Sequence, residues 1–242
     1  MQVGFLICGA QKAGTTTLAA YCREHPALGM PEEKELHFFD RDDNFESAPD
    51  YDLYHHHFQG LDTNTLLGEA TPVYMYWPQA AERIHQYNAD MKLLVVLRNP
   101  VERAYSHWQM EYNRGLETLD FGTAIREEGQ RLQQAGETRR VWSYIDRGHY
   151  PGQLDKLFSL FGRDQVLVLQ SEKLKSAHQD VLAQVSAFLG IEAFPESRGL
   201  ALNTQSYTAA MPDADRQFLR QIFADDISRL ESMLDWDLTA WR

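Results

Sequence analysis

The residues best suited to do chemistry lie in a short turn near the N-terminus. The stretch GAQKAGTTT, Gly9 to Thr17, follows the apolar run VGFLIC and precedes LAAYC. A strand that leads through such a turn into a helix presents backbone N–H groups and a partial positive charge to an anion. Gly14 allows close backbone approach, and the N–H groups and hydroxyls of Thr15, Thr16 and Thr17 would face the ligand. We therefore predict a phosphate site; an ordinary polar-capped turn is the weaker alternative.

The same turn departs from the Walker A pattern in one place. That pattern needs Gly, four residues, Gly, and then Lys followed by Ser or Thr. Gly9 and Gly14 have the required spacing, but Thr15 stands where the lysine belongs, and Lys12 lies inside the loop. The loop thus predicts phosphate binding without predicting phosphoryl transfer from ATP.

A second group of residues lies in LRNPVERAYSHW. Arg98 follows the apolar run of residues 92–97, at the carboxyl end of a predicted strand, where open α/β sheets place their ligands. Ser106 lies six residues beyond Pro100, about 9 Å along a helix at ~1.5 Å per residue. A guanidinium group can span such a gap, so Arg98 and Ser106 could meet one phosphate. On spacing alone, a strand-end salt bridge and a solvated serine explain these residues equally well.

A third group consists of Glu35 and His37 in the segment ELHFF. On an extended segment, side chains two residues apart point to the same side. Such a pair could remove a proton from a hydroxyl and stabilise the developing charge. Without the other two groups, a surface carboxylate beside a packed aromatic loop would be the better interpretation.

The elements that must position these groups alternate between apolar strands and amphipathic helices. This alternation indicates an α/β fold with a central, mainly parallel sheet flanked by helices, of the P-loop nucleotide-binding type. We expect one domain over residues 1–242, and we predict residues 115–147 to be a charged, helical lid. Strands are predicted over residues 3–8, up to residue 69, and over 92–97 and 165–169. Helices are predicted over 15–24, 79–87, from Pro100, 151–161, 181–189 and 213–234. On the helix that begins at Pro100, helical spacing predicts a buried stripe of Val101, Ala104, Tyr105, Trp108 and Tyr112.

Composition limits the partners. The formal net charge of −12 argues against nucleic acid as a main partner but allows a small anionic ligand. No apolar run approaches the roughly 18 residues of a membrane span, and the N-terminus lacks the basic region of a signal peptide, so we expect a cytoplasmic location and no transmembrane segment. Cys8 and Cys22 are predicted to be buried and reduced. The tract of residues 55–57, HHH, is predicted to be an ordinary turn, and no metal site is expected.

Together the three groups resemble the PAPS-dependent sulfotransferases, especially the heparan sulfate sulfotransferase branch and its bacterial relatives. That family has a K-x-G-T loop after its first strand, matched by Lys12–Thr15. It has an E-x-H-F-F segment, matched by Glu35–Phe39, and an arginine, proline and serine pattern, matched by Arg98, Pro100 and Ser106. The resemblance covers nearly the whole chain and implies a single sulfotransferase domain.

The resemblance also implies the chemistry. The donor would be 3′-phosphoadenosine 5′-phosphosulfate (PAPS), and the product PAP. Lys12 would offset charge on the oxygen that bridges phosphate and sulfate, Glu35 would be the general base, and His37 would support it. In-line displacement of this kind needs no metal, because fixed cations and N–H dipoles supply the stabilisation. The implied donor-binding residues are Lys12, Ala13, Gly14, Thr15, Thr16 and Thr17 for the phosphosulfate, and Arg98 and Ser106 for the 3′-phosphate.

Two departures from the family bear on the acceptor and on the 3′-phosphate. Heparan-type members have Glu-Lys-Thr-Pro near the acceptor, whereas this chain has EATP at residues 69–72. The missing cation and the acidic net charge favour an acceptor less anionic than heparan, and we expect a small-molecule or lipid-like hydroxyl acceptor. The family also has a late lysine-containing loop over the 3′-phosphate, and the comparable residues 202–207 contain no lysine.

Two other functions compete with sulfuryl transfer. One is a P-loop nucleoside or small-molecule kinase with a degenerate loop, which Thr15 at the Walker lysine position argues against. The other is a non-catalytic nucleotide-binding protein, for which neither Lys12 nor Glu35 would be needed.

Overall fold

The structure is a computed structural model and describes residues 1–133, 138–196, 199 and 210–242. The chain divides into two compact units. The sheet unit comprises Met1–Leu97 and Leu154–Thr204, and the helical unit comprises Arg98–Gln153 and Gln205–Arg242.

The sheet unit is built on five parallel strands in the order β2-β3-β1-β4-β5. The central strand β1 pairs on both sides, with Phe5 opposite Gly68 on one neighbour and opposite Lys92 on the other. Strands buried on both faces read as continuous apolar runs rather than alternating ones, which is why FLICG and KLLVVL lie at the centre. The predicted α/β fold with a parallel sheet is confirmed. The strands are β1 (Phe5–Gly9), β2 (Leu28–Gly29), β3 (Leu66–Ala70), β4 (Lys92–Leu97) and β5 (Val166–Gln170).

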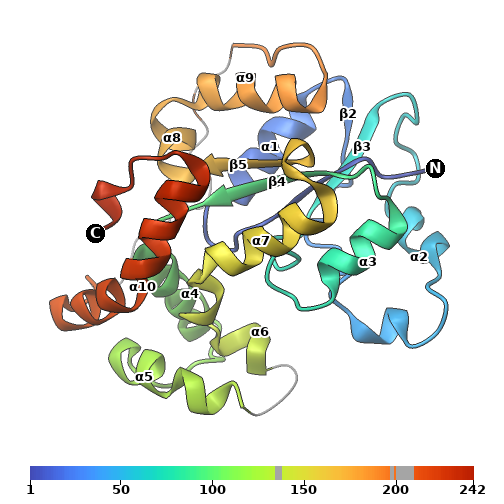
Figure 1. The fold of residues 1–242 in the computed structure, drawn as a ribbon. Helices are drawn as coiled ribbons and strands as arrows, with labels where there is room; N and C mark the ends of the chain where they lie inside the picture. Colours follow the sequence, from blue (N-terminus) through green and yellow to red (C-terminus); the bar gives the residue numbers. More distant parts are fainter. Residues whose placement is uncertain (134–137, 197–198, 200–209) are drawn as a thin grey trace. The chain divides into compact units, whose positions relative to one another are not determined.

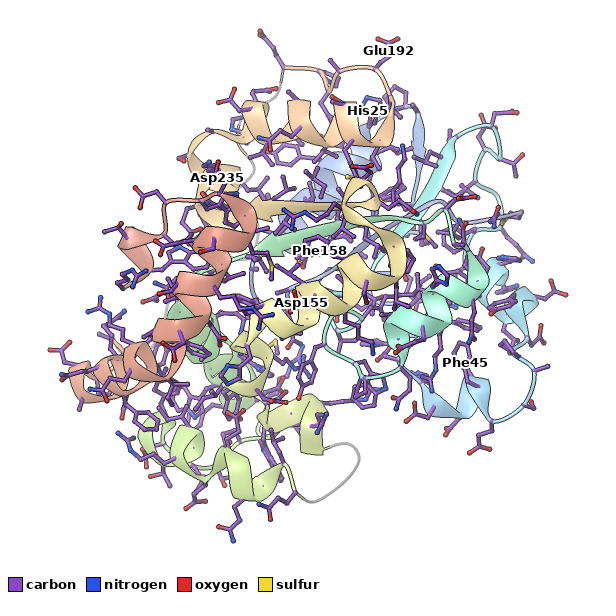
Figure 2. All side chains as sticks on the ribbon, viewed as in Figure 1. His25, Phe45, Asp155, Phe158, Glu192 and Asp235 are labelled. Carbon is purple, nitrogen blue, oxygen red and sulfur yellow. The ribbon has the colours of Figure 1, made fainter. Side chains whose placement is uncertain are left out.

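One face of the sheet carries α1 (Thr15–Glu24) and α9 (His178–Leu189) (Figure 1). Figure 2 shows His25, which follows α1, beside Glu192, which follows α9; the histidine Nε2 lies 3.1 Å from the Glu192 carbonyl oxygen. Helix α9 ends as predicted at Gly190, whose φ of 75° gives it the left-handed conformation typical of a helix C-terminus.

The other face carries α3 (Ala80–Tyr87) and the sheet-unit part of α7 (Tyr150–Phe161), from Leu154 onward (Figure 1). The ammonium of Lys156 on α7 pairs with the Glu82 carboxylate on α3 at 2.8 Å. The sequence did not predict five short elements of this unit, which are β2, the 3-10 turns Asp42–Phe45 and Arg163–Gln165, α2 (Tyr51–His56) and α8 (Ser171–Ser176).

The helical unit begins at the residues predicted to start a helix. The Asn99 side chain accepts a hydrogen bond from the N–H of Val101 (3.0 Å), and Pro100 takes the first helical position, where its missing N–H costs nothing. This unit contains α4 (Pro100–Asn113), α5 (Phe121–Arg131), α6 (Thr138–Trp142), the first residues of α7 and α10 (Asp213–Leu234). It also contains 3-10 turns at Asp146–Gly148 and Thr239–Trp241.

Buried carboxylates connect the described parts of the predicted lid, residues 115–133 and 138–147, within the helical unit. The Glu117 carboxylate accepts a hydrogen bond from the Tyr144 hydroxyl (2.8 Å), and its side chain is fully buried. The Glu128 carboxylate accepts from the backbone N–H of Asp146 (2.7 Å). Buried carboxylates with several donors rigidify the chain around them, so the described part of the predicted lid has its own internal framework.

The predicted buried stripe on α4 is only partly correct. Val101, Ala104 and Tyr105 are buried as expected, whereas Trp108 is half-buried and Tyr112 is 48% exposed. The buried stripe ends before Tyr112 because this residue lies in the last turn of α4. Its ring packs against Trp108, with centroids 5.1 Å apart, and does not enter the core.

The two cysteines are buried free thiols, as predicted. Burial raises the pKa of both Cys8 and Cys22 to about 12, so neither is a thiolate at neutral pH. Across the described ranges, every helix is too short or too polar to span a bilayer.

Candidate active site

The phosphate loop joins the end of β1 to the start of α1. Gly14 is the N-cap of α1, with φ 104° and ψ 13°, so no side chain caps this helix, and its first turn contains no acidic residue. Lys12 also has a positive φ, 70°, which is uncommon for a non-glycine residue and clusters at functional sites. A helix N-terminus without a capping side chain or an acidic residue suits an anion, so the residues present fit the phosphosulfate group.

The three threonines of the loop differ in what they can offer a ligand. Thr15 is buried, whereas Thr16 and Thr17 are half-buried. The N–H of Thr17, expected to face the anion, donates to the carbonyl oxygen of Gly14 at 3.1 Å. The Thr17 N–H is therefore already used within the helix, and Thr17 would contact a ligand through its hydroxyl group.

Glu35 and His37 come together, but not through an extended backbone. Their φ values are 63° and 53°, so the expectation of an extended segment is wrong. The two side chains nevertheless meet, with His37 Nε2 3.6 Å from Glu35 Oε2. The Glu35 N–H donates to the carbonyl oxygen of Ala70 at the end of β3 (3.1 Å), which anchors the pair at the carboxyl edge of the sheet. A left-handed backbone conformation at a non-glycine residue costs energy and persists only where the surrounding structure enforces it, as it does at Glu35 and His37.

Asp40 completes a line of three groups and was not predicted from the sequence. Its Oδ2 lies 2.9 Å from Nδ1 of His37, and the residue is fully buried. The only sequence signal was its position directly after ELHFF. Asp40 therefore fixes the orientation of the imidazole that faces Glu35.

The pKa values of this line are displaced in opposite directions. Burial raises the pKa of Glu35, but pairing with His37 and the charge of Lys34 outweigh it and hold that pKa at about 2. The bond to Asp40, and then the pairing with Glu35, raise the pKa of His37 to about 9 despite burial. At neutral pH the structure thus holds an imidazolium between two carboxylates.

Lys34 is the second residue that the sequence interpretation missed. Its Nζ lies 2.8 Å from Oε1 of Glu35 and 2.8 Å from Oγ1 of Thr16. The candidate base and the phosphate loop therefore share a single cation.

An aromatic cluster packs against the segment of residues 35–39. The ring of Phe38 stacks on Tyr54, with centroids 4.9 Å apart, and the Phe38 N–H donates to the Tyr74 hydroxyl (3.0 Å). Beside them Glu69 is buried, accepts a hydrogen bond from the Thr71 hydroxyl (2.7 Å), and has its pKa raised to about 7 by burial. The E-x-H-F-F phenylalanines thus position the acidic and imidazole groups.

Arg98 and Ser106 belong to the helical unit, whereas the phosphate loop and Glu35 belong to the sheet unit. Arg98 directly precedes the N-cap of α4, is half-buried, and accepts a hydrogen bond from the Tyr150 hydroxyl at its carbonyl oxygen (3.0 Å). Ser106 lies on α4 and is only 7% exposed. Residues 202–207, the segment comparable to the late lysine loop, lie outside the described residues.

The histidine tract has ordinary partners. His55 lies 2.9 Å from the Tyr87 hydroxyl, and His57 lies 2.9 Å from the Glu33 carboxylate. Within the part of the chain that the structure describes, no cluster of three or more histidine, cysteine or acidic side chains could hold a metal ion.

A family-level match covers both the phosphate loop and the Glu35 segment. Residues 4–211 match the family described as the sulfotransferase domain. The chain belongs to the sulfotransferase family. This finding confirms the family inferred from the sequence.

Two curated mouse proteins show which family members are similar. Heparan sulfate glucosamine 3-O-sulfotransferase 6 is 33% identical over 194 residues, covering 77% of this chain and 52% of the relative. Heparan sulfate glucosamine 3-O-sulfotransferase 3A1 is 32% identical over 190 residues, covering 77% of this chain and 45% of the relative. The chain thus spans about half the length of these relatives.

Solved structures give the same fold. The sulfotransferase from Alicyclobacillus acidocaldarius has a TM-score of 0.87 and 31% identity, covering 100% of this family member and 99% of that chain. The sulfotransferase domain from the curacin biosynthetic pathway, at 15% identity, has a TM-score of 0.58 over 98% of this chain and 99% of that one; at that identity it speaks for the fold alone.

Proposed function

We propose that this chain transfers a sulfuryl group from PAPS to an acceptor hydroxyl by in-line displacement, with Glu35 as the general base. The observation that carries the proposal is the Lys34 bridge, which connects the Glu35 carboxylate to the Thr16 hydroxyl through two contacts of 2.8 Å. A base that lies beside an anion-binding helix start is what transfer from a bound phosphosulfate requires. The kinase and non-catalytic alternatives have no comparable support from the family match.

The sheet-unit residues have distinct roles in this proposal. The N–H groups of Thr15 and Thr16, with the hydroxyls of Thr16 and Thr17, bind the phosphosulfate, and Ala13 and Gly14 let the loop backbone approach it. Lys12 offsets the charge on the leaving 5′-phosphate oxygen. Glu35 accepts the acceptor's hydroxyl proton. The His37 imidazolium, held by Asp40 at 2.9 Å, orients that carboxylate.

The 3′-phosphate of the donor is assigned to Arg98 and Ser106. This assignment rests on the family pattern of arginine, proline and serine, which residues 98–106 follow. A guanidinium group binds a phosphate with two parallel hydrogen bonds. The 3′-phosphate distinguishes PAPS and PAP from ATP, so these two residues would determine donor identity.

The acceptor is proposed to be a hydroxyl compound of low negative charge, small or lipid-like. The relatives named above are sulfotransferases of heparan sulfate glucosamine. In this chain, however, Ala70 follows Glu69 where the heparan-type pattern has lysine, and the net charge is −12. Repulsion would disfavour a polyanionic acceptor. The cytoplasmic location expected from the sequence stays a prediction.

Transfer of radiolabelled sulfate from PAPS to a panel of hydroxyl acceptors tests the function. We expect label transfer by the wild-type protein. With Glu35→Gln we expect a loss of about 10²-fold or more, the size of a general-base contribution, while PAP binding is retained. A Glu35→Gln protein that transfers at the wild-type rate would exclude Glu35 as the base.

A further inference from the structure

Lys34 connects two parts of the candidate site that are far apart in the sequence. Its ammonium nitrogen lies 2.8 Å from Oγ1 of Thr16 and 2.8 Å from Oε1 of Glu35. Thr16 lies in the first turn of α1, and Glu35 is hydrogen-bonded to Ala70 at the end of β3. Both partners lie in the sheet unit, which gives this bridge a defined geometry.

The bridge leaves Glu35 in a poor state for proton transfer. The pairing with His37 and the charge of Lys34 outweigh burial and hold the pKa of Glu35 at about 2. A general base is most effective when its pKa lies near the working pH. A carboxylate with so low a pKa accepts a proton weakly, and it becomes a stronger base when Lys34 moves away.

Donor binding would offer Lys34 a better partner. If Thr16 holds the phosphosulfate, negatively charged oxygens arrive next to an ammonium group that already contacts Thr16. The Lys34 and Glu35 side chains are 27% and 32% exposed, and a pair of this kind contributes only ~0–1 kcal/mol. A bound phosphosulfate would offer the Lys34 ammonium several anionic oxygens and hence more than one charge-assisted hydrogen bond, against the single contact with Glu35 Oε1, so the exchange of partners is favourable.

We propose that Lys34 senses the donor: its ammonium group leaves Glu35 for the phosphosulfate oxygens when PAPS binds, which frees the Glu35 carboxylate to take the acceptor's proton. This inference rests on the proposed function. The proton then passes to Glu35, the acceptor oxygen bonds to sulfur, and the bridging S–O bond breaks with its electron pair on the 5′-phosphate of PAP. His37 stays beside Glu35, with Asp40 and Glu69 as the further charged groups around that imidazole.

A functional consequence follows from this exchange. Before the donor binds, the base is paired with Lys34 and inactive. Once PAPS is in place, the cation stabilises the group being transferred and the base is available. The acceptor can therefore be deprotonated only in the presence of donor.

Calorimetry with PAPS on four proteins tests the exchange: wild type, Lys34→Met, Glu35→Gln and the double variant. Glu35→Gln should tighten PAPS binding by up to about fivefold, because Lys34 no longer has to leave a partner. Lys34→Met should weaken binding about tenfold or more in the Glu35→Gln background. In the wild-type background Lys34→Met should weaken PAPS binding less, because that substitution also removes the cost of breaking the Lys34–Glu35 pair.

The sign of this coupling distinguishes sensing from shielding. If Lys34 stays paired with Glu35 and only neutralises it, Lys34→Met leaves an uncompensated carboxylate next to the donor. The substitution then weakens PAPS binding more in the wild-type background than in the Glu35→Gln background. That result, or equal binding by all four proteins, would overturn the inference. A wild-type protein that does not bind PAPS would instead overturn the proposed function together with the inference.

Two controls separate these effects from misfolding and from net charge. Lys156→Met also removes a lysine that pairs with a glutamate at 2.8 Å, and it should leave PAPS binding unchanged. Lys34→Arg keeps the charge and should bind PAPS within about threefold of wild type, because a guanidinium can make the same charge-assisted bonds. Thermal unfolding of each variant checks that its fold is retained.

Discussion

The substitution Asp40→Asn isolates the charge that holds His37. It keeps the shape of the side chain but removes the negative charge 2.9 Å from Nδ1 of the imidazole. The bond to Asp40 is the largest cause of the rise in the His37 pKa from 6.5 to about 9. That rise of about 2.5 pH units corresponds to about 3 kcal/mol before solvent screening. Because the His37 side chain is 32% exposed, we expect Asp40→Asn to lower its pKa by about one unit or more.

Proton NMR titration of the His37 ring measures this pKa directly. A matched control is Asp42→Asn, which removes the same charge from an aspartate that is 60% exposed and pairs with Arg83. The control should leave the His37 titration where it is in the wild-type protein. An unshifted His37 in Asp40→Asn, or an equal shift in Asp42→Asn, would refute the reasoning.

The same substitution has a predictable effect on stability. Because the folded pKa of His37 is raised, the stability it contributes is fully present below about pH 6.5 and is lost as pH rises through about 9. Asp40→Asn should therefore flatten the dependence of unfolding free energy on pH between those values. Urea unfolding at both pH values measures the difference, and an unchanged slope would contradict the assignment.

Three further predictions concern the supports of the site and of the helical unit. Burial raises the pKa of Glu69 to about 7, so the free energy of unfolding falls as pH rises from about 4.5 through 7. At pH 8, Glu69→Gln should therefore be more stable than the wild type by up to about 3 kcal/mol in urea unfolding. Gly14→Ala should cost about 1–2 kcal/mol, because φ is 104° there, and should weaken PAP binding in calorimetry. Tyr144→Phe removes a hydroxyl that donates to buried Glu117 (2.8 Å) and should cost about 1–2 kcal/mol of stability in thermal unfolding. Unchanged stability in Gly14→Ala or Tyr144→Phe, or no gain in Glu69→Gln at pH 8, would contradict the corresponding assignment.

The sequence predicted elements best where local signals agreed with burial. The predicted bounds of α1, α10 and β4 match the structure, because Gly14, Pro212 and the apolar run Leu93–Leu97 each mark a boundary. Helix α2, over Tyr51–His56, was missed because a six-residue helix carries too few turns to show a period. Tyr112 was wrongly placed in the core because periodicity cannot show where the packing partners of a helix end.

At the site, the sequence indicated the residue types but not how they meet. Glu35 and His37 were proposed from their spacing, yet they meet through left-handed backbone at both positions, which spacing does not encode. Asp40 and Lys34 were missed for the same reason: their contacts depend on how residues 34–40 fold back onto α1 and β3. Neighbouring charges in a sequence become partners only when the backbone turns them toward one another.

Calorimetric titration with PAP and with ATP tests the central claim most directly. If this sulfotransferase family member uses PAPS, PAP should bind and ATP should bind at least about tenfold more weakly, since the loss of a phosphate–guanidinium contact costs roughly 1.5–3 kcal/mol. Arg98→Ala should remove most of that preference. ATP binding equal to or tighter than PAP binding would contradict the account.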